Sequence, residues 1–190
     1  MQNLIKIAVD AMGGDNSPTK VLSGISEFLK TNSDVFFRIF GPKSKLEIEL
    51  SKVSIKKNFF EIINCEEVIK DNDTPLTAAK KKNTSMWQAI NDVKEKNSDV
   101  IISAGNTGAL FVISKLNINM VENISKPALA GLWPNKIDMN IVLDLGANVE
   151  CDEKNFEEFA LMGAALHNAL FPLDKSKVAL LNIGSEEIKG

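Results

Sequence analysis

Four short segments of the chain combine glycine with small polar residues, which is the composition of a loop that binds an anion. They are residues 10–15 (DAMGGD), 103–108 (SAGNTG), 144–148 (DLGAN) and 182–187 (NIGSEE). Glycine lets the backbone approach a ligand closely, and the N–H groups that begin a following helix attract negative charge. Each segment alone is equally an ordinary tight turn. Together they indicate a site for a phosphate-type anion, provided that the fold brings them to one place.

Each segment follows a run that is typical of a buried β-strand, and these runs alternate with helical patterns. Such alternation predicts an α/β fold, with a mainly parallel or mixed sheet as the middle of three α/β/α layers. In sheets of this kind, ligands bind outside the carboxyl ends of the strands, where the four segments stand. We expect strands at 4–9, 35–40, 59–63, 100–103, 127–133, 141–145 and 177–183, and helices at 17–29, 46–53, 84–96, 108–116 and 155–171, the first capped by Ser17 with Pro18 following.

Several classes of protein are excluded by composition and by missing motifs. The fold is Rossmann-like but lacks both GxGxxG after a strand and GxxxxGK[ST], so NAD or ATP binding is not expected. A net charge of −3, with Arg38 as the single arginine, argues against nucleic acid. Cys65 and Cys151 form no CxxC pair and are expected to be reduced thiols of a cytoplasmic protein.

The titratable residues near these segments leave several roles open. Asp10, Asp15 and Asp144 stand at strand ends, where a carboxylate holds Mg²⁺ or, at least as often, orients a loop. Lys189 follows the last segment and either clamps an oxyanion as a point charge or is simply exposed. His167, the only histidine, shares a helical face with apolar residues, so we expect it to pack rather than to catalyse. No nucleophile triad and no metal site are expected.

With their spacing, these segments resemble one family closely: the chain looks like the amino-terminal part of PlsX, the phosphate acyltransferase of bacterial phospholipid synthesis. The resemblance runs from end to end of the chain and in the family's order. Because family members are longer, we expect residues 1–190 to form a single α/β domain of a longer enzyme. The resembling stretches are 7–15 (IAVDAMGGD), 81–86 (KKNTSM), 103–110 (SAGNTGAL), 127–130 (PALA), 144–149 (DLGANV), 159–163 (FALMG) and 180–184 (LLNIG).

The resemblance implies a reaction in which an acyl carrier protein thioester and inorganic phosphate give acyl phosphate and free carrier protein. It also implies a homodimer, no cofactor, and loose association with the inner face of the membrane. The residues suit this chemistry, because phosphate is itself the nucleophile and a thiolate leaves readily. Two rival hypotheses stay open: a phosphotransacetylase-like transferase that uses coenzyme A thioesters, and a non-catalytic remnant that binds a partner.

The same resemblance assigns roles to individual residues. Asn106 and Lys189 are the expected catalytic residues, with Asn106 in the phosphate cradle and Lys189 compensating charge. Lys80, Lys81 and Lys82 become a docking patch for the acidic carrier protein, although such a run is usually just solvated. The expected substrate-binding residues are Asp10, Gly13, Gly14, Asp15, Ser103, Gly105, Thr107, Gly108, Asp144, Asn148 and Gly184.

Overall fold

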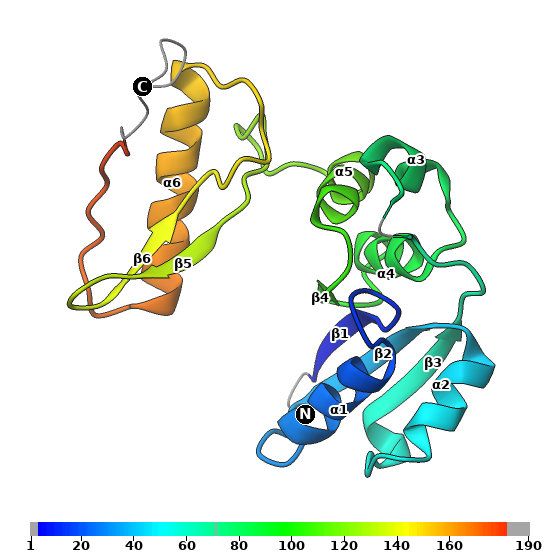
Figure 1. Ribbon diagram of the computed structural model, residues 1–190. Coiled ribbons are helices and arrows are strands. Elements are labelled where there is room, and N and C mark those ends of the chain that lie inside the picture. The colour runs from blue at the N-terminus through cyan, green and yellow to red at the C-terminus, as the bar shows by residue number, and fades with distance from the viewer. Residues whose placement is uncertain (1–3, 71, 182–190) are drawn as a thin grey trace. The chain divides into compact units, whose positions relative to one another are not determined.

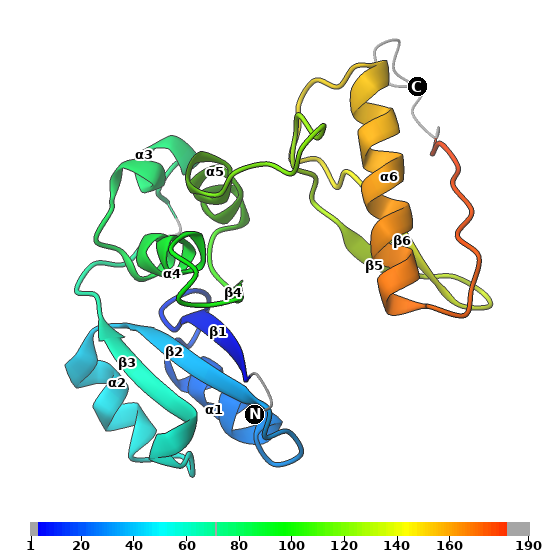
Figure 2. The same cartoon turned by 180° about the vertical axis from the view of Figure 1, so that it is seen from behind.

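The computed structural model describes residues 4–70 and 72–181. The chain divides into two compact units, Met1–Asn119 and Met120–Gly190. Figures 1 and 2 show the elements of both units from opposite sides. The expectation of one domain across residues 1–190 stays a prediction.

The first unit is built on a parallel sheet, which confirms the expected α/β class. The strands lie in the order β3-β2-β1-β4, and every neighbouring pair is parallel. At the end of β1, Asp10 pairs with Phe40 of β2 on one side and with Ser103 of β4 on the other. The segments that follow β1 and β4 therefore begin at the same edge of the sheet. The strands are β1 (Ile5–Asp10), β2 (Val35–Gly41), β3 (Phe60–Asn64) and β4 (Val100–Ser103).

Helices cover both faces of this sheet (Figure 1). One face carries α1 and α2, and the other carries α4, against which α5 packs. α3 lies against α5, and the short 3-10 helix η1 (Lys57–Phe59) leads into β3. The helices are α1 (Thr19–Phe28), α2 (Lys43–Leu50), α3 (Pro75–Lys80), α4 (Ser85–Lys94) and α5 (Thr107–Asn117).

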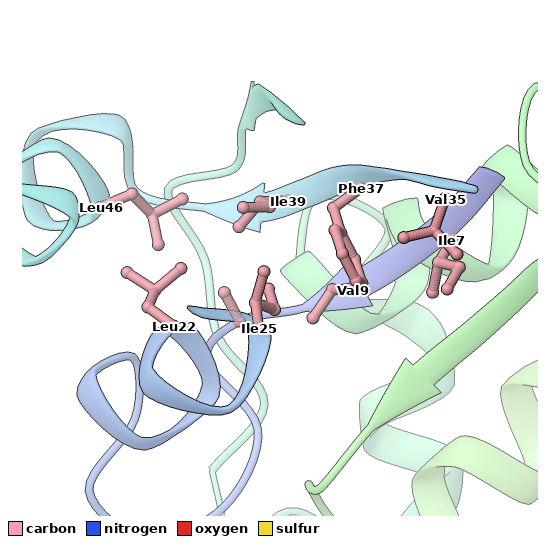
Figure 3. Packing of buried hydrophobic residues seen from close by; sticks show 9 residues of the cluster. Ile7, Val9, Leu22, Ile25, Val35, Phe37, Ile39 and Leu46 are labelled. Carbon is pink, nitrogen blue, oxygen red and sulfur yellow. The ribbon is translucent and has the colours of Figure 1, made fainter. Parts of the chain in front are cut away.

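Alternation along the strands decides which side chains enter which core. Ile7 and Val9 of β1 point to the same side as Phe37 of β2, where Leu22 and Ile25 of α1 meet them (Figure 3). The intervening residues of the strands face α4 and form a second cluster of Ala8, Phe40, Cys65 and Ala89. Burying each large apolar side chain contributes about 1.5–3 kcal/mol, so both helical layers are held firmly on the sheet.

An ion-pair network also fastens α4 to the sheet. Arg38 of β2 donates from Nε and Nη2 to the two carboxylate oxygens of Asp92, at 2.7 and 2.9 Å, and it also pairs with Glu61 of β3. Ser98 donates to Asp92 at 2.6 Å. The hydrogen bond to Asp92 is the main cause of a raised pKa of Arg38, whose charge is thereby secured.

The second unit combines a hairpin with a long helix. β5 (Gly131–Pro134) pairs with β6 (Met139–Val142) in antiparallel fashion, and α6 (Glu153–Leu170) follows. A capping box begins α6: Asp152 accepts a hydrogen bond from the backbone of Asn155, and the Asn155 side chain accepts one from the backbone of Asp152. The β5–β6 pair forms a two-stranded sheet of its own, and the four-stranded sheet of the first unit is entirely parallel.

Several local expectations differ from the structure: β5 begins at Gly131 rather than at residue 127, and β6 ends at Val142 rather than at residue 145. Ser17 does not cap α1, because its hydroxyl donates instead to the carbonyl of Gly13 at 2.5 Å and Pro18 takes the cap position. α2 begins at Lys43, directly after Pro42, so its one buried residue lies within the helix rather than at its start. Residues 177–181 have no regular structure, since no strand pairs with them among the described residues, and 182–183 lie outside that part. Across residues 4–70 and 72–181, no helix is both long and apolar enough to cross a membrane.

Candidate functional site

A buried carboxylate organises the edge where β1 and β4 end. The Asp10 side chain is only 2% exposed. Its Oδ1 accepts a hydrogen bond from the Ser85 hydroxyl at 2.6 Å, and its Oδ2 accepts one from the Ser103 hydroxyl at 2.7 Å. The N–H of Met12 also donates to Oδ1, at 3.3 Å. One side chain thus joins the β1 loop, the first residue of α4 and the end of β4.

The loops after β1 and β4 touch through their backbones. A Cβ atom at Gly13 would lie 2.6 Å from the backbone nitrogen of Gly105, and one at Gly105 would lie 2.8 Å from Cε of Met86. Gly14 has a φ of +83°, a conformation that side chains disfavour. Packing of loop against loop is therefore a sufficient reason for glycine at these positions.

The start of α5 presents unpaired donors. Asn106 caps the helix, because its Oδ1 accepts from the N–H of Ala109 at 2.9 Å. The N–H of Gly105 donates to the Ser103 hydroxyl at 3.1 Å. The N–H groups of Thr107 and Gly108 have no acceptor among the residues that the structure describes. Two adjacent free N–H groups at a helix start favour an anion.

Two pockets meet at these loops, and both are lined by Asp10, Gly13, Gly14, Gly105 and Asn106. The larger, about 930 Å³, extends over the face of the sheet that α1 covers. The smaller, about 310 Å³, extends toward the segment after β3. Each also has a lysine in its lining, which sequence reasoning missed.

These missed lysines are Lys20 of α1, in the larger pocket, and Lys70, in the smaller one. The signal for Lys20 was its place in the first turn of the helix that follows the DAMGGD loop. Ser85 was also missed; it follows Thr84, which caps α4 and accepts a hydrogen bond from the N–H of Trp87. The role of Ser85 depends on a contact with Asp10, 75 residues away, which no local pattern reveals.

In the described part of the second unit, the predicted residues Asp144 and Asn148 form hydrogen bonds within that unit. Asp144 accepts hydrogen bonds from the N–H of Leu129 at 2.7 Å and from the N–H of Asn148 at 2.7 Å. The Asn148 amide also donates to the carbonyl of Pro127 at 2.8 Å. This arrangement ties the segment before β5 to the loop after β6. A role of Asp144 and Asn148 in substrate binding stays a prediction.

The predicted docking lysines differ from one another in environment. Lys80 and Lys82 are exposed, whereas Lys81 is half-buried. Its Nζ donates to both carboxylate oxygens of Asp73, at 2.6 and 2.8 Å, which holds the pKa of Asp73 below its usual range. Lys81 therefore fastens the turn between α3 and α4, and Lys80 and Lys82 remain available at the surface.

The remaining candidates are His167, Gly184, Lys189 and Asp15. His167 is half-buried on α6, and its ring lies 5.1 Å from that of Phe171, in keeping with a packing role. Gly184 and Lys189 lie outside the described residues. Asp15 is exposed at the rim of the larger pocket. The part of the chain with described coordinates contains no group of three His, Cys, Asp or Glu that suits a metal ion.

The fold and the site define a class: a parallel α/β domain whose unpaired N–H groups at the strand ends suit an anion. Comparison with known proteins specifies this class further. Residues 5–190 match the model of a family described as "Fatty acid synthesis protein", and the chain belongs to that family. The resemblance seen in the sequence is thereby confirmed.

Three curated relatives are named phosphate acyltransferase. The chain is 58% identical to that of Pelagibacter ubique, over 100% of this chain and 57% of the relative. It is 43% identical to that of Neorickettsia sennetsu, over 98% of this chain and 55% of the relative. It is 41% identical to that of Caulobacter vibrioides, over 100% of this chain and 53% of the relative. The chain therefore spans just over half the length of these relatives.

Proposed function

We propose that this protein carries the phosphate site of an acyltransferase that moves a fatty acyl group from an acyl carrier protein thioester to inorganic phosphate. The observation that carries the proposal is the pair of unsatisfied N–H groups at Thr107 and Gly108. They stand beside the glycine loop after Asp10, where two pockets meet. The relatives named phosphate acyltransferase are consistent with phosphate as the anion.

The proposed reaction asks little of the protein beyond orientation and charge. A phosphate oxygen attacks the thioester carbonyl carbon, a C–O bond forms, the C–S bond breaks, and the thiolate leaves and takes up a proton. Positioned N–H groups hold phosphate in line with the carbonyl and lower the barrier by orientation. The Asn106 side-chain amide is the further donor that we assign to the cradle. No protein nucleophile is needed.

Positive charge for the proposed site comes from two sources. Lys189 keeps the charge-compensating role that the family resemblance implies. Lys20 and Lys70 line the two pockets and add charge from within the described residues. A lysine acts here as a mobile point charge that can follow the phosphate between its free and acylated forms.

Further features of the proposal concern partners and location. Lys80 and Lys82 would meet the acidic carrier protein, because both are exposed and, among the residues that the structure describes, neither forms an ion pair as Lys81 does. A homodimer and peripheral association with the inner membrane face from the cytoplasmic side complete the proposal, as the family resemblance implies.

The test is direct transfer by the chain itself. It is mixed with acyl carrier protein thioester and inorganic phosphate, acyl phosphate is followed by phosphorus NMR, and released carrier protein is followed by mass spectrometry. The proposal predicts both products, each dependent on phosphate. Transfer from acyl coenzyme A alone would favour the phosphotransacetylase-like rival. Phosphate binding without transfer from either donor would favour the partner-binding remnant.

Variants then test the site. Asn106→Ala and Lys189→Ala should each reduce the use of phosphate far more than His167→Ala, because only the first two contribute to the proposed cradle. His167→Ala serves as the control, since His167 packs on Phe171 of the second unit. If His167→Ala were the most damaging of the three, the assigned roles would be wrong.

A further inference from the structure

The charge of Asp10 is unexpected at the place it occupies. A carboxylate that is 2% exposed is costly unless hydrogen bonds satisfy it. Within the described part of the chain, no lysine or arginine forms an ion pair with it. It lines both pockets, and the larger one is also lined by Thr107 and Gly108, so its charge opposes the binding of any anion there. Burial of this charge and its repulsion of an anion are both unfavourable, so the favourable contribution of Asp10 comes from its hydrogen bonds.

That contribution can be followed from atom to atom. An ionised carboxylate only accepts hydrogen bonds, so each serine that contacts it must donate its single hydroxyl proton. Ser103 donates to Oδ2 of Asp10 at 2.7 Å, and its oxygen is thereby left to accept the N–H of Gly105 at 3.1 Å. The peptide unit before Gly105 is fixed by this chain of bonds. Asn106, Thr107 and the start of α5 follow directly from it.

Ser85 fixes the opposite wall of the loop. It is 1% exposed and donates to Oδ1 of Asp10 at 2.6 Å, and its own N–H donates to the carbonyl of Glu67 at 3.1 Å. The next residue, Met86, has its methyl group in the space that a side chain at Gly105 would need. Asp10 therefore sets the position of α4 and the conformation of residues 103–105 at the same time.

We propose that Asp10 is a positioning residue: through Ser103 and Ser85, its carboxylate holds residues 104–108 in the conformation that leaves the N–H groups of Thr107 and Gly108 open to phosphate. The ligand in this statement rests on the proposed function. The positioning itself rests on the hydrogen bonds of Asp10.

The substitution Asp10→Asn separates positioning from charge by the sign of its effect. It keeps the shape of the side chain and removes the negative charge. If charge were all that mattered, phosphate would bind more tightly to the variant. If positioning dominates, phosphate binds more weakly, by about tenfold, because an amide cannot accept both serine protons. The measurement is calorimetric titration of the chain with inorganic phosphate at fixed ionic strength.

The serines provide a matched control. Ser98 is buried and donates to the buried Asp92 at 2.6 Å, as Ser85 donates to Asp10, but Asp92 lines neither pocket, whereas Asp10 lines both. Ser103→Ala and Ser85→Ala should weaken phosphate binding, whereas Ser98→Ala should lower the melting temperature without changing the dissociation constant. Equal weakening by Ser98→Ala, or unchanged or tighter binding by Asp10→Asn, would overturn the proposal.

A second readout separates this inference from the proposed function. Amide NMR shifts of Gly105, Thr107 and Gly108 report the loop conformation without any ligand. If the unsubstituted chain fails to bind phosphate, the proposed function fails, yet displaced shifts in Ser103→Ala and not in Ser98→Ala would still support positioning by Asp10. Unmoved shifts in Ser103→Ala would contradict it, even where Asp10→Asn fails to fold.

Discussion

At the scale of single residues, surroundings rather than residue type decide the chemistry. Cys65 illustrates this, because burial, and next the nearby charge of Asp10, raise the pKa of its thiol to about 11. Its N–H is held by the carbonyl of Gly41, and its side chain packs with Ala8 and Phe40. A neutral, buried thiol is neither a nucleophile nor a metal ligand. Cys65 therefore acts as a small apolar residue of the core.

The two cysteines should accordingly differ in reactivity. A thiol reagent at pH 8 should modify Cys151, which is half-buried, and leave Cys65 unmodified until the protein unfolds. Peptide mass spectrometry before and after addition of denaturant measures both sites in one sample. If Cys65 of the folded protein is labelled as fast as Cys151, its thiol is not buried and its pKa is not raised.

Two glycines should respond to alanine with opposite signs. At Gly13 the added methyl group meets the backbone nitrogen of Gly105 at 2.6 Å, which neither loop can avoid cheaply, so we expect a loss of about 1–3 kcal/mol. At Gly24, within α1, a methyl group meets nothing within 4 Å, and alanine should add about 0.5–1 kcal/mol through helix propensity. Thermal unfolding measures both, and a Gly13→Ala variant as stable as Gly24→Ala would refute the close approach of the loops.

At the scale of elements, local signals predicted strands and helices well and their interconnections poorly. Residues 100–103 form the predicted strand, because β-branched residues there precede a small-residue loop. α5 begins at Thr107, one position before the predicted start, because the Asn106 side chain caps it. By contrast, the strand expected at 177–183 has no pairing in residues 177–181, since a strand needs a neighbour that sequence alone does not supply. The contact of Ser85 with Asp10 was not predicted either, because it also depends on residues that are distant in sequence.

The link between α6 and the segment before β5 should be sensitive to acid. Glu158 accepts hydrogen bonds from the hydroxyl and the N–H of Ser125, at 2.7 and 2.8 Å, which lower its pKa. Because the folded pKa lies below the unfolded one, this stabilisation is complete above the unfolded value and is lost as pH falls through the folded value. We expect Glu158→Gln to be less stable than the unsubstituted chain at neutral pH, with the difference in melting temperature shrinking on acidification.

The control for this prediction is Glu153→Gln, an exposed residue of the same helix. The difference in melting temperature between Glu153→Gln and the unsubstituted chain should change less with pH than the corresponding difference for Glu158→Gln. If the difference in melting temperature between Glu158→Gln and the unsubstituted chain stays constant or grows on acidification, the link between Glu158 and Ser125 is contradicted.

At the scale of the whole molecule, the first unit brings together residues that are distant in sequence. Asp10 meets Ser103 across 93 residues because β1 and β4 are neighbours in the sheet, and it meets Ser85 across 75 residues because α4 packs on β1. Of the four predicted segments, the structure unites 10–15 and 103–108, 144–148 is satisfied within the second unit, and 182–187 lies outside the described residues. The spacing of motifs was enough to indicate the family, whereas the geometry of their contacts required the fold.

The central claim is that the start of α5 binds phosphate through backbone N–H groups. It is tested most directly by titrating the ¹⁵N-labelled chain with inorganic phosphate, with chloride at matched ionic strength as the reference. The account predicts saturable shifts that are largest at the amides of Thr107 and Gly108, with smaller ones at Gly13 and Gly14. Shifts that leave Thr107 and Gly108 unmoved, or that chloride reproduces, would contradict it.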